Sequence, residues 1–288
     1  MKTYNDLYLS TRRALRVAGV SAHDLEARLI VAFATGKTRD DLLSSSRLFI
    51  TDNAILKNVD EIIERRLAGE PIAYIVGEWE FYGLPIAVNE SVLIPRADTE
   101  VLAEHAIKLL KANTAQARVL DLCTGSGCIG LAIAANVPGS KIVLVDNSEK
   151  ALSICRTNML SNRLTRNVTA LEADAMKAPP ALLGMFDMIV SNPPYIPRKD
   201  IISLDKSVRS YEPIEALDGG SDGLDFFRAI TTSWRSLLKD GGVLLFECGI
   251  GQAKDVKDIM LGAGFSDISI HRDLQDVERV VIGYFKQQ

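Results

Sequence analysis

The sequence is poor in the residues that build metal centres and disulfide frameworks. Its 288 residues include four cysteines and three histidines, and no two cysteines stand in a Cys-x-x-Cys pair. Structural zinc sites and disulfide-stapled domains depend on such spacings. We therefore expect no bound metal, and we expect reduced thiols in a cytoplasmic protein.

Long apolar runs and an excess of basic charge are also missing. No segment approaches the ~18–20 apolar residues of a membrane-spanning helix, and the first twenty residues lack the apolar core of a signal peptide. The net charge is −4, so the chain has no excess of positive charge for binding the phosphates of a long nucleic acid. We therefore expect neither membrane association nor direct sequence-specific nucleic-acid binding.

The residues that are present divide the chain near residue 71. Residues 1–71 have apolar residues at helical spacing, with Gly36 and Gly69 where helices are expected to end. Residues 72–96 are rich in aromatic and β-branched residues and are interrupted by glycine and proline, which is typical of a β-hairpin. We predict a helical N-terminal domain over 1–71 and a β-hairpin linker over 72–96.

Strands and helices alternate in residues 97–288. Such alternation favours an α/β fold with a mostly parallel sheet and helices on both of its faces. We predict seven strands, with the last one inserted antiparallel beside its predecessor. The predicted strands are RVLDLC, KIVLVD, VTALEA, FDMIVSN, GVLLFEC, SDISIHRD and RVVIGYFK.

A glycine loop follows the first of these strands. Gly125, Gly127 and Gly130 form a G-x-G-x-x-G pattern that opens a helix, and Asp146 ends the next strand. This pattern is compatible with a dinucleotide, which would place its pyrophosphate at the helix N-terminus. By itself the pattern is a weak signal, because other ligands also need a close approach to glycine backbone.

Asp121, four residues before Gly125, discriminates between the possible ligands. A pyrophosphate roughly 6 Å from this carboxylate would cost about 3 kcal/mol at an effective dielectric constant near 20. S-adenosylmethionine has a sulfonium and an ammonium group and no phosphate, so the same carboxylate would favour it. We then expect Asp146 to accept hydrogen bonds from the ribose hydroxyls and Asp174 to face the adenine amino group.

The segment Ser191–Tyr195, SNPPY, ends the fourth strand and should face the same crevice. A planar NH2 group that receives a methyl group needs two acceptors in its plane and a free perpendicular direction. The Asn192 side-chain carbonyl and the Pro193 main-chain carbonyl can supply them, since Pro193 and Pro194 stiffen the turn. Tyr195 offers an aromatic face on which a flat amide or base can stack.

On these motifs the sequence resembles the HemK/PrmC family, the protein-(glutamine) methyltransferases that modify class-1 peptide chain release factors. The resemblance covers nearly the whole chain, and the first and last of its four segments are far more specific than the N-P-P-Y tetrapeptide. The segments are residues 71–100, 119–134, 190–197 and 211–224.

The resemblance implies a helical N-terminal domain that recognises the partner and a Rossmann-like, seven-stranded class I methyltransferase domain over 97–288. It implies S-adenosylmethionine as donor, S-adenosylhomocysteine as product, and the Gly-Gly-Gln glutamine of a release factor as acceptor. We also expect a monomer. It places the cofactor loop at Cys123 through Gly127, the ribose carboxylate at Asp146 and the substrate-amide motif at Asn192, Pro193, Pro194 and Tyr195. Together with the residues inferred above, the expected cofactor residues are Asp121, Cys123, Thr124, Gly125, Ser126, Gly127, Asp146, Asp174 and Asn192.

Two positions depart from the family pattern. Family members usually have glycine at the position of Cys123, so the backbone approach there is expected to be tighter. Some members have an aromatic residue where this chain has Ala175, which leaves the adenine without that stacking partner. Arg96 is predicted either to help dock the partner or to pair with Glu100, four residues further on.

Three other classes of protein share parts of this pattern. The first class is a methyltransferase that acts on an exocyclic amino group of a DNA or RNA base. Such an amino group also has two N–H donors in its plane, but these enzymes usually have an additional basic domain. A nicotinamide-dependent oxidoreductase would explain the glycine loop. A binding protein without turnover would use the crevice alone, and its activity would survive Asn192→Ala.

Overall fold

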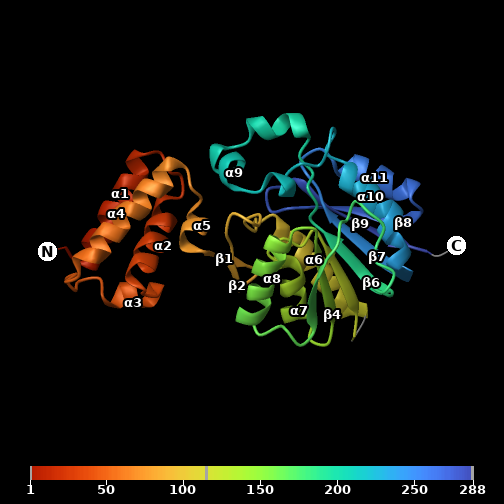
Figure 1. Cartoon of the computed structure of the whole chain (residues 1–288), viewed down its shortest axis with the longest axis horizontal. Helices are drawn as coiled ribbons and strands as arrows, with labels where there is room; N and C mark the ends of the chain where they lie inside the picture. The colour runs from red at the N-terminus through yellow and green to blue at the C-terminus, as the bar shows by residue number, and fades with distance from the viewer. Residues whose placement is uncertain (1, 114–115, 287–288) are drawn as a thin grey trace. The chain divides into compact units, whose positions relative to one another are not determined.

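The computed structural model describes residues 2–113 and 116–286, and the chain divides into two compact units (Figure 1). One unit comprises Met1–Glu78 with Lys206–Tyr211, and the other comprises Trp79–Asp205 with Glu212–Gln288. Within the described ranges no helix has both the length and the apolar character required to cross a membrane.

The first unit is helical, as the sequence predicts. Thr3 and Thr38 form capping boxes at the starts of two helices, and Gly36 and Gly69 end two others in the left-handed conformation. A partly buried ion pair between Glu26 and Arg66 joins two of the helices. The helices are α1 (Tyr4–Val17), α2 (His23–Thr35), α3 (Arg39–Ser44), α4 (Asn53–Ala68), α5 (Ile72–Val76) and α9 (Lys206–Tyr211).

Helix α5 corrects the expectation of extended structure from residue 72 onward. Its sequence, IAYIV, is rich in β-branched residues, yet Pro71 precedes it and Gly77 ends it with a φ of 80°. The hairpin is confined to β1 (Glu78–Phe81) and β2 (Leu84–Ala87). Tyr82 and Gly83 connect these strands with φ values of 50° and 76°, as a tight two-residue hairpin turn requires.

The second unit contains the predicted seven-stranded sheet. Its strand order is β5-β4-β3-β6-β7-β9-β8, and the final strand, β9, is antiparallel to both of its neighbours. The chain moves outward from β3 to β5 and then returns to place β6 on the other side of β3. This reversal makes the carboxyl ends of β3 and β6 the switch point of the sheet, where ligands bind in doubly wound folds. The strands are β3 (Arg118–Leu122), β4 (Lys141–Asp146), β5 (Val168–Glu172), β6 (Phe186–Ser191), β7 (Leu238–Glu247), β8 (Phe265–Arg272) and β9 (Glu278–Phe285).

Helices cover both faces of the sheet. Leu120 and Leu122 belong to a buried cluster with side chains of the helices near the C-terminus, whereas Asp121 points to the opposite face and bonds Gly130. Alternate residues of β3 therefore contact different helix layers. The helices of this unit are α6 (Thr99–Asn113), α7 (Cys128–Asn136), α8 (Glu149–Ser161), α10 (Asp225–Ser233) and α11 (Ala253–Gly262), with short 3₁₀ segments η1 (Arg198–Ser203), η2 (Ile214–Ala216) and η3 (Trp234–Leu237).

Candidate active site

A cavity of about 630 Å³ lies at the carboxyl ends of the central strands. This volume is in the range of pockets that hold small molecules and cofactors, roughly 300–1,000 Å³. Residues from the glycine loop, the end of β4 and the end of β6 share its wall. They include Cys123, Thr124, Gly125, Ser126, Asp146, Asn147, Ser148, Ala173, Ala175, Asn192 and Pro194.

The glycine loop reaches the cavity through an unusual backbone. Cys123, Gly125 and Gly127 all have left-handed φ values, of 57°, 54° and 84°. A side chain at the Cys123 position is therefore strained, and glycine, which the resemblance leads us to expect there, would avoid this strain. Burial raises the pKa of the Cys123 thiol well above its ordinary value. The thiol therefore stays protonated and lines the cavity as a neutral group, not as a nucleophile. At Gly130 a Cβ would lie 2.2 Å from Leu144 Cδ2, so glycine permits the close contact between α7 and β4.

Asp121 lies beneath the loop and is not among the described residues that line the cavity. Its Oδ2 accepts hydrogen bonds from Thr124 Oγ1 at 2.7 Å and from Gly130 N at 3.0 Å. Burial raises its pKa to about 7, against the opposing effect of these two bonds. The carboxylate thus holds the loop onto α7, and its contact with a ligand stays a prediction.

Asp146 and Asp174 differ in their positions. Asp146 lines the cavity, and its two oxygens accept bonds from Gly125 N at 2.8 Å and Ser148 N at 3.0 Å. Each oxygen retains a second lone pair for a hydroxyl donor. Burial raises the pKa of Asp146. Asp174 instead caps a turn through Met176 N at 2.9 Å and pairs with Lys177, while its neighbours Ala173 and Ala175 line the cavity.

The SNPPY corner meets the glycine loop at this cavity. Asn192 and Pro194 line it, Pro193 is buried, and Asn192 Nδ2 donates to Thr99 Oγ1 at 3.2 Å. The Tyr195 ring does not contribute to the lining formed by the described residues; its hydroxyl lies 3.4 Å from Glu247 Oε1. The predicted stacking of a substrate amide on Tyr195 therefore stays a prediction.

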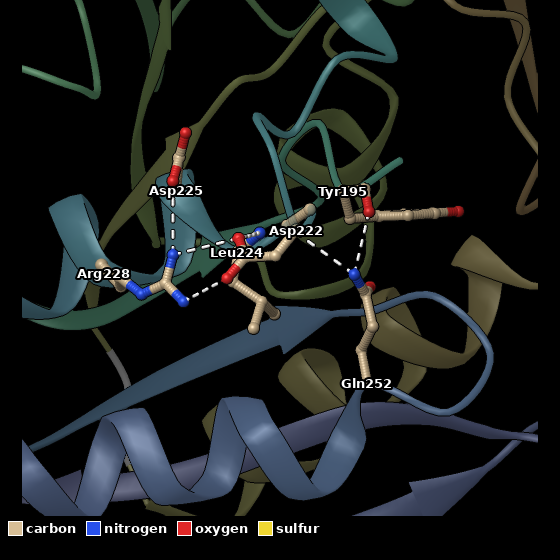
Figure 2. A network of polar contacts seen from close by, with 7 residues as sticks. Tyr195, Asp222, Leu224, Asp225, Arg228 and Gln252 are labelled. Atoms are coloured by element: carbon tan, nitrogen blue, oxygen red, sulfur yellow. Dashed lines mark hydrogen bonds and ion pairs between the residues drawn. The ribbon is translucent and has the colours of Figure 1, made fainter. Parts of the chain in front are cut away.

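A second set of residues, which we did not single out from the sequence, supports this corner (Figure 2). Gln252 Nε2 donates to the main-chain carbonyl of Tyr195 at 2.9 Å and to that of Gly223 at 3.3 Å. Gly249 N donates to Gln252 Oε1 at 2.9 Å. A Cβ at Gly223 would lie 2.3 Å from the Tyr195 carbonyl oxygen. Three loops therefore meet at Gln252, and the only signal in the sequence is its place shortly after a buried strand.

Arg96 lines the same cavity and pairs with Glu212 rather than with Glu100. Its Nη2 lies 2.5 Å from Glu212 Oε1, and the Glu212 carboxylate is almost fully buried. Glu100 instead accepts a bond from Tyr82 N at 2.8 Å. Of the two alternatives for Arg96, the pairing with Glu100 is wrong, because Glu212, far away in the sequence, pairs with Arg96 instead. Docking of the partner by Arg96 stays a prediction.

Comparison with known proteins gives the same picture as the geometry. Residues 97–204 match the family model described as the methyltransferase small domain, and residues 6–77 match the PrmC N-terminal domain. A methyltransferase structure from Pyrococcus furiosus shares the fold with a TM-score of 0.52 at 18% identity, covering 78% of this chain and 98% of that chain. The fold and the site define a Rossmann-like methyltransferase.

Two relatives identify the family. The release factor glutamine methyltransferase of Thermodesulfovibrio yellowstonii is 42% identical over 226 residues, which are 78% of this chain and 80% of that protein. The protein of the same name from Geobacter sulfurreducens is 40% identical over 273 residues, which are 95% and 93% of the two chains. The chain belongs to the release factor glutamine methyltransferase family.

Proposed function

We propose that this enzyme transfers a methyl group from S-adenosylmethionine to the side-chain amide nitrogen of the glutamine in the Gly-Gly-Gln motif of class-1 peptide chain release factors. One observation supports this most strongly. Asn192, which follows β6 and has a carboxamide side chain, lines the same cavity as the glycine loop that follows β3. A side chain that can accept hydrogen bonds from a substrate amide therefore lies in the same cavity as the loop that would bind the cofactor.

The donor set of the loop fits S-adenosylmethionine better than a dinucleotide. Residues 121–128 contain no lysine or arginine to neutralise a pyrophosphate, while Asp121 and Asp146 flank the loop. A Cβ at Gly125 would meet no atom within 4 Å, so the backbone there is open to a ligand. Cys123 through Gly127 would hold the methionyl part and Asp146 the ribose. When bound, the group supplies an electrophilic methyl carbon on a sulfonium.

The chain's own contribution to the reaction is placement. Asn192 Oδ1 and the Pro193 carbonyl would accept the two N–H groups of the glutamine amide in its plane, leaving its π face toward the methyl group. No side-chain base is required, because the amide nitrogen would be positively charged and strongly acidic once it carries the methyl group, and its proton can then pass to water. Holding the two reactants in this arrangement can supply roughly 7–11 kcal/mol of the barrier reduction.

The roles of the parts of the chain follow from this reaction. We assign partner recognition to residues 1–71, a linker to 72–96 and catalysis to 97–288. The partner is a class-1 release factor, so the reaction takes place in the cytoplasm, and one chain contains every residue that the reaction uses. We therefore propose a monomer.

Mass spectrometry of a purified release factor tests the proposal. After incubation with the enzyme and labelled S-adenosylmethionine, the peptide containing Gly-Gly-Gln should gain one methyl group on the glutamine. A release factor with alanine in place of that glutamine is the control and should stay unlabelled. Label on another residue, or on DNA or RNA but not on the release factor, would contradict the assignment.

A further inference from the structure

A short chain of buried polar groups connects Asn192 to the interior. It begins at the Asn192 amide after β6, passes through Thr99 at the start of α6, and ends at Glu247, the last residue of β7. Thr99 is 2% exposed and Glu247 1% exposed, and the Thr99 hydroxyl lies close enough to Glu247 to lower the pKa of its carboxyl. Among the described residues Glu247 Oε2 has no partner. None of these contacts is part of the cofactor loop.

The chemistry of these groups determines which one donates and which one accepts in each hydrogen bond among Asn192, Thr99 and Glu247. An ionised carboxylate only accepts, so Glu247 favours the orientation in which the single hydroxyl proton of Thr99 points toward it. Thr99 Oγ1 can then only accept from Asn192, which must present its NH2 group at 3.2 Å. The other end of the amide, Oδ1, is left for the cavity. With the reverse orientation, an NH2 group would face the N–H groups of a substrate amide and repel them.

We propose that Thr99 and Glu247 are positioning residues, which orient the Asn192 carboxamide so that its oxygen, and not its nitrogen, meets the substrate amide. The consequence for catalysis rests on the proposed function, whereas the orientation itself rests only on the three side chains. Tyr195 takes part from the other side, because its hydroxyl lies 3.4 Å from Glu247 Oε1.

The surroundings of Glu247 make this orientation depend on pH. Burial raises its pKa to about 7, while the bond from Thr99 and the charge of Arg279 oppose the shift. A protonated Glu247 can donate to Thr99, and the direction of the bonds is then no longer fixed. The other titratable groups near Glu247 are Asp98, whose charge raises its pKa, Tyr195, whose hydrogen bond lowers it, and the neutral thiols Cys128 and Cys248.

Substitutions of Thr99 test the catalytic consequence. Thr99→Val keeps the shape and removes the hydroxyl, so kcat should fall roughly 10- to 100-fold, the usual effect of losing a partner behind a functional ligand. The KM for S-adenosylmethionine should change little. Thr99→Ser should restore the rate, because it restores the hydroxyl. Thr231→Val is the matched control, since Thr231 is equally buried but bonds its own helix at Phe227 O. Wild-type kcat in Thr99→Val would overturn the proposal.

The pH profile adds a readout that a purely structural role would not move. In the wild type kcat should decrease as the pH falls through about 7, because protonation of Glu247 releases the orientation. Glu247→Gln keeps an acceptor oxygen and has no proton to gain, so this decrease should disappear. An acidic decrease that persists unchanged in Glu247→Gln would contradict the assignment.

The orientation can also be observed without turnover. In protein labelled with ¹⁵N-asparagine, the Asn192 side-chain NH2 signal, assigned by its loss in Asn192→Ala, should titrate near pH 7 in the wild type. It should not titrate in Glu247→Gln or Thr99→Val. If the wild type fails to methylate a release factor, the proposed function fails and this titration still decides the inference. If it methylates and the signal does not titrate, only the inference fails.

Discussion

At the scale of single residues, the most informative positions are those that conflict with local preference. Cys123 has a φ of 57°, a conformation that glycine adopts at lower cost. The sequence indicates the position as unusual, through its resemblance to a family with glycine there. It cannot supply the angle, because the angle depends on how the loop attaches to Asp146 and to Asp121 below it.

Asp121 is the residue whose burial has a direct thermodynamic consequence. Its pKa is raised from 3.8 to about 7 in the folded protein. The folded state therefore binds a proton more tightly than the unfolded chain, so this group destabilises the fold increasingly as the pH rises from about 4 to 7. Glu247, with a pKa of about 7, acts in the same direction.

We predict that Asp121→Asn, which keeps one acceptor oxygen for Thr124 and Gly130, changes stability in a pH-dependent way. Relative to the wild type, the variant should gain stability between pH 5 and pH 8, because it has no buried charge to form. Urea unfolding of both proteins at the two pH values measures this difference. An equal difference at pH 5 and pH 8 would show that Asp121 does not titrate in this range.

At the scale of elements, the regular part of the fold follows from sequence pattern and the irregular part does not. The central strands β3 and β6 are apolar and buried, and the alternation of strands with helices predicts the architecture. Helix α5 is not predicted, since its five residues favour a strand, whereas in the fold Pro71 and Gly77 flank it and Ile72, Ala73 and Ile75 are buried. The connection from β6 to η1 has no periodicity, because its backbone bonds go to distant residues, as in Ile196 N to Leu217 O and Arg198 N to Gly220 O.

The loop before α10, residues 217–224, packs against the main chain of the SNPPY segment and holds it in place. Gly219 N donates to Ile196 O at 2.9 Å, and a Cβ at Gly219 would lie 2.7 Å from Tyr195 Cα. On the far side of the loop Arg228 pairs with Asp222 and Asp225 (Figure 2). Two of the three glycines of this loop, Gly219 and Gly223, thus permit close contact with a neighbouring main chain.

We predict that Gly223→Ala impairs methyl transfer while Gly241→Ala does not. Both glycines have left-handed φ values, of 80° and 73°, so each substitution should cost about 1 kcal/mol of stability from backbone strain. A Cβ at Gly241 would meet nothing within 4 Å, whereas at Gly223 it collides with Tyr195 O and Gln252 Nε2. Turnover and thermal unfolding of the two variants separate the effects. Equal turnover in both would show that the corner tolerates displacement.

At the scale of the whole molecule, the sequence predicts the class of ligand better than the contacts that hold it. The glycine loop, Asp146 and Asn192 meet at one cavity, since all three lie at carboxyl ends of parallel strands. Glu247 and Gln252 were not singled out, because both contact Tyr195, which is more than fifty residues away from each of them in the sequence. Such contacts are fixed by the tertiary fold and have no local periodicity.

The family assignment covers the whole molecule as well as the site. The match to the Geobacter sulfurreducens relative spans 95% of this chain, and the PrmC N-terminal domain model covers residues 6–77 of the helical unit. The net charge of −4 gives the molecule no excess of positive charge for binding a phosphate backbone. Both observations favour a protein acceptor over a nucleic acid.

The central claim is that Asn192 holds the amide that receives the methyl group. Single-turnover transfer to a release factor by Asn192→Ala, together with calorimetric binding of S-adenosylhomocysteine, tests it most directly. The rate should fall about 100-fold or more, the scale expected when a group that positions the reacting atoms is removed, and the affinity should fall much less. Asn136→Ala, whose amide bonds its own helix at Ala132 O, is the control. Transfer by Asn192→Ala at the wild-type rate would contradict the account.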